Sequence, residues 1–411
     1  MTLSECLLLL KPDVIKTKKD QVVVYTMLGF GLSFLGLIIY GASARSTANT
    51  KQLLLTNVIC RHGARTPVDT YPNDPYLNYS FSPIGWGHLT NEGKLDLYNL
   101  GKDLRNRYKT FLSKFYYPNL YKSQSTDSDR TLSSVQLINA GLWEPRDTQK
   151  WGPINWQPIP VRYEALNEDK LLLVRVPCAQ YEIELKKVIE SEPIQEIYKK
   201  NKNLFEYVSK STGKDIKNFD DLQDVFTTLK AEESFNLTLP EWTVDYYPQK
   251  MYEPTAFSFY LRTYNKKLIR LKAGLLLKRI IENIKSKINY KETESTSSKD
   301  VNMYLYGGHD ATIANILSAL NLFEGEQHVP DYAATILIET YVDRVDNQYY
   351  IEVYYRKSVN DVFQMKTIPG CAKSCRFDKF LDLLQEYIPG DWEKECYTDD
   401  PNFVPPPPIG P

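Results

Sequence analysis

Short apolar runs alternate with helical patterns along most of this chain. The run LLLTNVIC at 53–60 is rich in β-branched residues and predicts a buried strand over 51–60. A turn-rich stretch from Thr66 to His88 follows it, and either Thr90 or Asn91 is expected to cap the next helix. That helix is indicated by residues at helical spacing, namely Leu97, Leu100, Leu104 and Tyr108.

The same strand–loop–helix order recurs twice. One unit has a strand at 122–123, a loop at 125–130 and a helix over 131–142. The other has a strand at 302–306, Gly307 to Asp310 as its loop, and a helix over 311–320. Strands that alternate with helices predict an α/β fold with a mainly parallel sheet. Two further runs, 333–342 and 349–355, predict a closing hairpin through 343–348.

Residues 180–255 have a different character: they are charged, show helical spacing and lack strand patterns. We interpret them as a helical cap inserted into an α/β core formed by 51–179 and 256–400. One long helix is expected from about Ala256 to Ile288, followed by a polar loop over 289–300. The Pro-rich tail at 401–411 predicts a stiff end.

The first 50 residues are expected to lie outside this fold. Residues 21–44 carry no charged side chain and would span about 36 Å as a helix, enough for a hydrocarbon core of about 30 Å. The lysines before this segment favour a cytosolic tail over 1–20, with the rest of the chain across the membrane. Alternatively, Ala42-Ser43-Ala44 fits a signal-peptide cleavage site, and the protein is secreted after removal of the segment. Both interpretations export residues 45–411 into the secretory pathway.

Export would allow the cysteines to form disulfides and two sequons to be glycosylated. Cys178, Cys371, Cys375 and Cys396 could form two disulfides in an oxidising compartment. Asn78 and Asn236 begin N-x-S/T sequons and are candidate glycosylation sites.

Composition narrows the classes of function. The 411 residues carry a net charge of -1, which gives no reason to expect nucleic acid as a partner. Only four histidines are present, so each one is informative. His62, His88, His309 and His328 show no metal-ligand spacing, and no metal or other cofactor is expected.

Three predicted strands end in residues suited to phosphate chemistry. Arg61, His62 and Arg65 follow the first strand, with Gly63 leaving room for a substrate beside the backbone. Ligands of parallel sheets bind beyond the carboxyl ends of the strands, and guanidinium groups present donor forks to phosphate oxygens. The second and third strands add to this cluster Arg130, His309 and Asp310. Together these side chains predict a phosphate pocket with a nucleophile and a proton donor.

A cysteine phosphatase was the rival interpretation. Its loop needs an arginine six positions after the cysteine, yet Thr66 stands there relative to Cys60. Cys60 is therefore expected at a buried strand end, and His88 and His328 as ordinary loop residues.

These motifs make the chain resemble the histidine acid phosphatases, the branch with prostatic, lysosomal and insect secreted enzymes. The resemblance covers roughly residues 50–400 and rests on VICRHGARTP (58–67), GWGHLTNEG (85–93), STDSDRTLSS (125–134), LPEW (239–242) and YGGHDATIANILSALN (306–321). It implies a phosphoglycerate-mutase-like core with helices on both faces of the sheet and a helical cap. It also implies a homodimer, and it leaves lysosomal residence open.

The resemblance further implies the role of each site residue. His62 would be the phosphorylated nucleophile and Asp310 the proton donor. The phosphoryl group would be bound by Arg61, Arg65, Arg130 and His309. The implied disulfides are Cys178–Cys396 and Cys371–Cys375.

The chemistry expected from these parts is metal-independent hydrolysis of phosphate monoesters through a phosphohistidine. Asp310 would have to start protonated, which favours acid pH. Two alternatives stay open at this point: a phytase-like inositol phosphate phosphatase, and a catalytically silent surface protein that binds a phosphorylated ligand.

Overall fold

A mixed sheet forms the centre of the computed structural model, which describes residues 50–293 and 301–405. In these described residues the sheet has eight strands in the order β3-β2-β4-β1-β5-β6-β7, with β8 paired to β6. The strands are β1 (Lys51–Arg61), β2 (Tyr121–Ser125), β3 (Val161–Arg162), β4 (Met303–Gly308), β5 (Thr335–Asp343), β6 (Tyr349–Arg356), β7 (Gln364–Lys366) and β8 (Cys375–Arg376). Strands β1 to β4 pair in parallel, and β5 to β8 pair antiparallel, with β5 and β6 forming the predicted hairpin.

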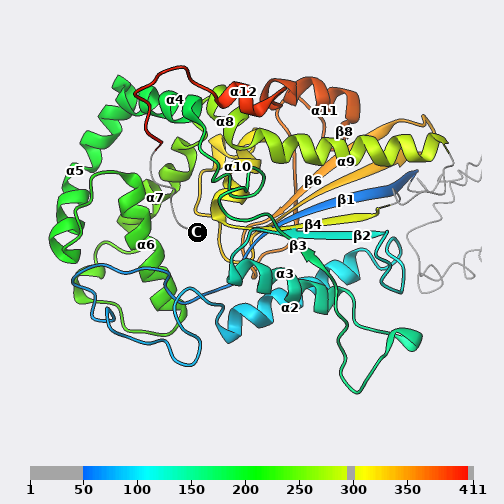
Figure 1. Cartoon of the computed structure of the whole chain (residues 1–411), viewed down its shortest axis with the longest axis horizontal. Helices are drawn as coiled ribbons and strands as arrows, with labels where there is room; N and C mark the ends of the chain where they lie inside the picture. The colour runs from blue at the N-terminus through cyan, green and yellow to red at the C-terminus, as the bar shows by residue number, and fades with distance from the viewer. Residues whose placement is uncertain (1–49, 294–300, 406–411) are drawn as a thin grey trace, which may run out of the picture. The chain divides into compact units, whose positions relative to one another are not determined.

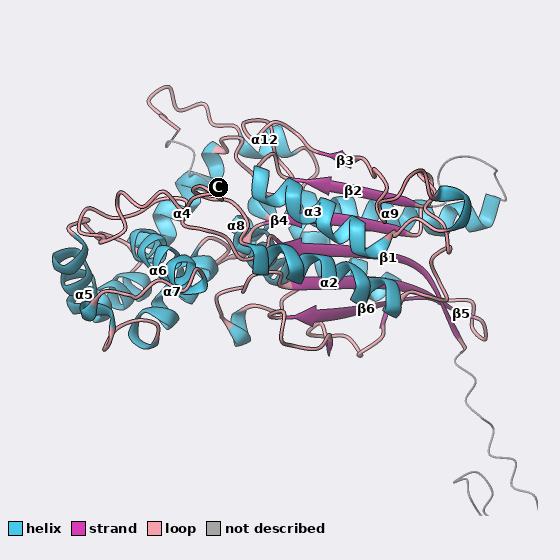
Figure 2. Cartoon of the chain, turned by 90° about the horizontal axis from the view of Figure 1, so that it is seen from below, coloured by secondary structure: helices cyan, strands magenta, loops and turns pink. Residues whose placement is uncertain are grey.

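Helices cover both faces of the sheet, as Figures 1 and 2 show. Helices α2 (Asn91–Arg107) and α3 (Asp129–Leu142) lie on one face, and α9 (Gly274–Thr293) lies on the other. Thr90 begins α2, where its side chain accepts a hydrogen bond of 3.0 Å from the backbone of Gly93. The α/β class with helices on both faces is therefore confirmed.

Helices α2 and α3 pack at two glycines that permit a very close crossing. A Cβ on Gly101 would lie 2.2 Å from the carbonyl oxygen of Ile138, and one on Gly141 would lie 2.1 Å from that of Tyr98. This contact fixes α3 against α2. Arg130 sits in the first turn of α3, at the other end of the helix from this contact.

Four helices lie beyond one end of the sheet (Figure 1). They are α4 (Ala179–Glu190), α5 (Glu192–Thr212), α6 (Phe219–Ser234) and α7 (Gln249–Leu261). They belong to one compact unit that spans Gln52–Pro411, so the division into core and cap stays a prediction. We use "cap" for helices α4 to α7 below.

The single long helix expected from Ala256 to Ile288 is wrong. The stretch holds α7, α8 (Lys266–Lys272) and α9. Asn265 starts α8 because its side chain accepts a 3.0 Å hydrogen bond from the backbone of Leu268. At Gly274 the chain packs so closely that a Cβ would lie 2.3 Å from the carbonyl oxygen of Tyr387. A capping residue and a tertiary contact thus interrupt a continuous apolar periodicity.

Both expected disulfides are present. Cys178–Cys396 joins the start of α4 to the end of α12 (Trp392–Cys396), and Cys371–Cys375 closes a short loop before α11 (Phe377–Leu384). Two disulfides are typical of proteins that fold along the secretory route.

The proposed membrane segment at 21–44 lies outside the described residues, as does the end of the Pro-rich tail. Among the helices of the described part, none is both long and apolar enough to cross a membrane.

Candidate active site

The carboxyl ends of three parallel strands meet at one edge of the sheet. In register, Cys60 of β1 and Ser125 of β2 both pair with Gly307 of β4. The chain beyond these ends is held by backbone hydrogen bonds from His62 to Gly308 at 3.0 Å and from Thr126 to Gly307 at 3.1 Å. The loops that carry the predicted site residues therefore converge.

His62 is held in one tautomer by its own loop. Its Nδ1 lies 2.9 Å from the carbonyl oxygen of Gly63, which only accepts hydrogen bonds. Nδ1 must then carry the proton, and Nε2 keeps its lone pair. The ring is 2% exposed, and its centroid lies 5.5 Å from that of His309.

Burial and four neighbouring charges keep His62 neutral. Desolvation lowers its pKa well below the usual value, and Arg130, Arg61, His309 and Arg65 lower it further. A neutral imidazole is a nucleophile, whereas imidazolium is not. His62 is thus suited to attack phosphorus even in acid solution.

Gly63 packs closely against the first turn of a helix. A Cβ at this position would lie 2.6 Å from the carbonyl oxygen of Gly93 in the first turn of α2. The glycine makes room for that helix, and the prediction that it makes room for a substrate is not needed to explain it. The contact sets the position of the loop that carries His62.

His309 faces a hydroxyl that sequence reasoning missed. Its Nε2 lies 2.9 Å from Oγ1 of Thr126, and both residues are buried. Burial lowers the pKa of His309 well below its usual value, and Arg130 lowers it further. Thr126 stands within the STDSDR stretch after β2, so its place next to Arg130 was the available signal.

Arg65 and Arg130 form a cationic site with unused donors. They are 5% and 8% exposed, and the Nε of each is buried without a hydrogen-bond partner. Burial and then Arg65 lower the pKa of Arg130 to about 9, so it remains a cation at neutral and acid pH. Buried donors without partners are costly. An anion bound between these groups would satisfy them.

Arg61 and Asp310 are paired with one another. Arg61 Nη2 lies 2.8 Å from Asp310 Oδ2, and its Nη1 donates to the carbonyl oxygen of Pro330 at 2.6 Å. The guanidinium also stacks 4.5 Å above the ring of Tyr332, a second residue that sequence reasoning missed. Asp310 Oδ1 accepts a 2.8 Å hydrogen bond from the backbone of Ala311.

This pairing changes the expected protonation state of Asp310. Burial alone would raise its pKa, but Arg61 and then His309 lower it, and the net direction is below the usual value. Asp310 is consequently ionised in the free protein. The expectation that it starts protonated is not supported for the free protein.

The cluster opens into a cleft of about 660 Å³. Five of the six predicted residues line it: His62, Arg65, Arg130, His309 and Asp310. Arg61 lies behind them with 1% exposure. The rest of the cleft wall comes from the cap, from the segment 173–178 that leads into it, from residues 68–71 after β1, and from Leu271, Lys272 and Ala311.

The remaining candidates lie outside this cluster. Cys60 is fully buried, and burial raises its pKa to about 12, so it carries no reactive thiolate. His88 is exposed, and His328 is buried with its Nε2 2.7 Å from the hydroxyl of Tyr355. Among residues 50–293 and 301–405, no group of three or more His, Cys, Asp or Glu is arranged to hold a metal ion. Asn78 and Asn236 are both exposed.

Comparison with known proteins matches the chain to one protein family. Residues 52–356 match the histidine phosphatase superfamily (branch 2). The chain is 34% identical to venom acid phosphatase of Apis mellifera over 87% of this chain and 89% of that protein. It is 33% identical to lysosomal acid phosphatase of Rattus norvegicus, covering 84% of this chain and 80% of the relative. Prostatic acid phosphatase of Homo sapiens is 32% identical, with 89% and 93% covered.

Solved structures share the fold at lower sequence identity. A Hafnia alvei phytase in complex with myo-inositol hexakis sulphate has a TM-score of 0.62 at 16% identity, over 85% of this chain and 99% of that chain. A Citrobacter braakii phytase has the same TM-score and identity over 84% and 99%. At this identity the likeness concerns the fold.

Proposed function

The chain belongs to branch 2 of the histidine phosphatase superfamily and is an acid phosphatase, and from this premise we propose that His62 is its nucleophile and Asp310 its proton donor. The observation that carries the proposal is the His62 tautomer, because the hydrogen bond to Gly63 leaves Nε2 free to attack. The phytase-like alternative has less support, because the similar phytases share the fold at 16% identity.

Phosphate binding is assigned to Arg65, Arg130 and His309, supported by the unpartnered nitrogens of both arginines. The two guanidinium charges would stabilise the equatorial oxygens as negative charge spreads over them. Arg61 is also assigned to phosphate binding. It lies behind the other residues of the cluster and would act through its ion pair with Asp310. Thr126 would orient His309 through the 2.9 Å contact between its hydroxyl and Nε2.

The proton for the leaving group would arrive with the substrate. Asp310 is ionised in the free protein, whereas a phosphate ester keeps one proton below its second pKa of about 6. We propose that the bound monoanion transfers this proton to Asp310. His62 Nε2 then forms a bond to phosphorus, the bond from phosphorus to the ester oxygen breaks, and Asp310 protonates that oxygen to release the alcohol.

The second step would regenerate the enzyme. Asp310, again ionised, takes a proton from water as the water oxygen attacks phosphohistidine. The bond between phosphorus and Nε2 breaks, Asp310 returns its proton to the phosphate, and inorganic phosphate leaves as the monoanion, so that Asp310 is ionised again. No metal is assigned a role.

Exported location, membrane attachment and assembly also belong to the proposal. Two disulfides and two exposed sequon asparagines support passage through the secretory pathway. Residues 21–44 are proposed to anchor the protein or to be cleaved after Ala44. A homodimer and a lysosomal destination rest on the relatives alone. Sequencing the mature N-terminus separates anchor from signal, because a start at Arg45 excludes the anchor.

Rapid quench with ³²P-labelled substrate tests the residue roles. We expect His62→Ala to lose the labelled phosphoenzyme and nearly all turnover, while His88→Ala, at an exposed loop histidine, behaves as wild type. Asp310→Asn should slow phosphorylation by alkyl phosphates about 10²–10⁴-fold and p-nitrophenyl phosphate much less. Inorganic phosphate should still inhibit, because the Arg65 and Arg130 cluster is intact. Label retained in His62→Ala, or equal slowing of both substrates in Asp310→Asn, would contradict the assignment.

The proton source has its own test. If the substrate supplies the proton, the alkaline limb of kcat/KM should move with the second pKa of the phosphate ester used. Substrates of different second pKa, assayed on the wild-type protein, give this comparison directly. A limb that stays at one pH for all substrates would assign the proton to the enzyme instead.

A further inference from the structure

The cleft continues from the phosphate cluster into a second half lined by charged residues of both signs. Its cations are Arg175, Lys214, Arg262 and Lys272, and its anions are Asp69, Glu182, Asp220 and Asp224. The formal charge of this distal half is therefore zero, although the phosphate cluster beside it is strongly cationic. Apolar side chains from Val68, Leu173, Val176, Leu185 and Val225 complete the wall.

Asp310 places the leaving group in this half of the cleft. Arg262 follows the last residue of α7 and lines the same cleft as Asp310, whose charge contributes to raising the pKa of Arg262. Asp310 is the proposed proton donor, and the departing oxygen must lie on its side of the phosphorus. The group attached to that oxygen then extends past Arg262.

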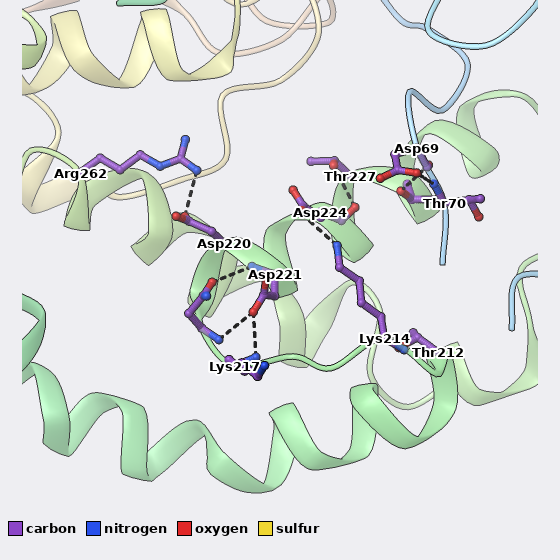
Figure 3. Close-up of polar contacts among 12 residues, drawn as sticks. Asp69, Thr70, Thr212, Lys214, Lys217, Asp220, Asp221, Asp224, Thr227 and Arg262 are labelled. Atoms are coloured by element: carbon purple, nitrogen blue, oxygen red, sulfur yellow. Dashed lines mark hydrogen bonds and ion pairs between the residues drawn. The ribbon is translucent and has the colours of Figure 1, made fainter. Parts of the chain in front are cut away.

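Two carboxylates of α6 form ion pairs with Arg262 and Lys214, two cations that could otherwise bind a second anion. Asp220 Oδ1 lies 2.9 Å from Arg262 Nη2, and Asp224 Oδ2 lies 3.0 Å from Lys214 Nζ. Figure 3 shows Asp220 and Asp224 reaching from the same helix toward these partners. They are four residues apart, so they share one helix face with Gln223, Thr227 and Thr228, which also line the cleft.

The third distal cation is similarly engaged. Lys272 Nζ donates to the carbonyl oxygen of Val174 at 3.1 Å and lies 5.2 Å from the ring of Tyr181. Burial and then Arg262 lower the pKa of Lys272 to about 8, while Glu182 raises it. A second anion entering this half would find Arg262, Lys214 and Lys272 already partnered, and it would meet carboxylates that repel it.

We infer that Asp220 and Asp224 determine substrate specificity by neutralising Arg262 and Lys214, so that the cleft selects phosphate monoesters whose leaving group carries no further anionic group. The inference rests on the proposed function, because it takes the distal half as the leaving-group site. It names the substrate class as monophosphates of neutral or zwitterionic alcohols with some apolar surface. Repulsion by fixed carboxylates is a recognised way to exclude a competing ligand.

The test compares fructose 6-phosphate with fructose 1,6-bisphosphate, which differ by one phosphate. Burial raises the pKa of Asp224 while its partner Lys214 lowers it, so the two substrates are compared over the range from acid to neutral pH. The wild type should have the lower kcat/KM for the bisphosphate. Asp220→Asn and Asp224→Asn should each raise the bisphosphate-to-monophosphate ratio of kcat/KM about tenfold, the effect of one unit charge a few ångströms away in a partly screened site.

Two matched variants control for charge and folding. Asp215→Asn removes the same charge next to the cap from an exposed pair with Lys217 and should leave the ratio unchanged. Asp224→Asn combined with Lys214→Gln removes both charges of one pair, and the ratio should return toward the wild-type value. This double variant distinguishes electrostatics from a general disturbance of α6.

The outcomes separate the inference from the proposed function. If fructose 6-phosphate is hydrolysed through phosphorylated His62 but neither Asp220→Asn nor Asp224→Asn changes the ratio, the specificity inference is wrong and the proposed function stands. A wild-type preference for the bisphosphate would also overturn it. If no phosphohistidine forms with either sugar phosphate, the proposed function itself fails.

Discussion

A buried carboxyl on the cap should make the stability of the protein fall as pH rises. Glu232 on α6 is 0% exposed, and neither of its carboxyl oxygens has a hydrogen-bond donor. Burial and then the nearby carboxyl of Asp74 raise its pKa to about 9. Asp74 lies in the loop after β1, where it accepts hydrogen bonds from Thr70 and from the backbone of Tyr76. The carboxyls of Glu232 and Asp74 thus lie close together, where α6 of the cap faces the loop that follows β1.

The magnitude follows from proton linkage. The folded protein holds the Glu232 proton up to about pH 9, whereas the ordinary pKa of 4.5 applies once the chain unfolds. A pKa raised on folding gives stability that is fully present below the unfolded value and is lost as pH rises toward the folded value. Since each pKa unit corresponds to about 1.4 kcal/mol, up to about 3 kcal/mol should disappear between pH 4.5 and pH 7.

Glu232→Gln removes this titration and keeps the shape of the side chain. We expect the difference in the free energy of unfolding, variant minus wild type, to increase steadily from acid to neutral pH. Urea titrations at several pH values measure it. Glu206→Gln, at an exposed glutamate of α5 paired with Lys202, is the control and should give a flat difference. A flat difference for Glu232→Gln as well would refute the buried, protonated carboxyl.

Two further predictions concern the disulfides and the glycines. Serine variants of Cys178–Cys396, whose partners are 218 residues apart, should lose about 5 kcal/mol of unfolding free energy, against about 2 kcal/mol for Cys371–Cys375, 4 residues apart; equal losses in urea titrations would contradict the loop-entropy reasoning. Gly63→Ala and Gly101→Ala should each cost about 1–3 kcal/mol through overpacking, but only Gly63→Ala should also reduce kcat, by up to about 10²-fold, because it displaces the His62 loop. Similar kcat in both variants would show that the contact of Gly63 with α2 does not position His62.

The candidate site was predictable because it depends on topology. Parallel strands bring their carboxyl ends to one edge, so residues after β1, β2 and β4 had to meet once the strands were identified. His62, Arg130 and Asp310 are far apart in sequence but follow strands paired at Cys60, Ser125 and Gly307.

Side-chain partnerships were not predictable in the same way. The ion pair between Arg61 and Asp310 depends on a carbonyl from Pro330 and on the ring of Tyr332, which come from a different part of the chain. The break between α7 and α9 depends likewise on a contact of Gly274 with Tyr387. Periodicity reports which face of an element is apolar, but it does not report which distant backbone atom will lie against it.

The directions of the pKa shifts explain how the enzyme can be active at acid pH. Burial among arginines keeps His62 neutral and therefore nucleophilic where a free histidine would be protonated, and Arg130 remains a cation. Neither group sets an upper pH limit near neutrality. The proton needed by Asp310 does set one, since we propose that it comes from the substrate monoanion. Glu232 acts in the same direction, because its proton favours the folded cap at acid pH. The acid range would then be fixed by the substrate's proton and by a buried carboxyl of the cap, with the nucleophile active throughout.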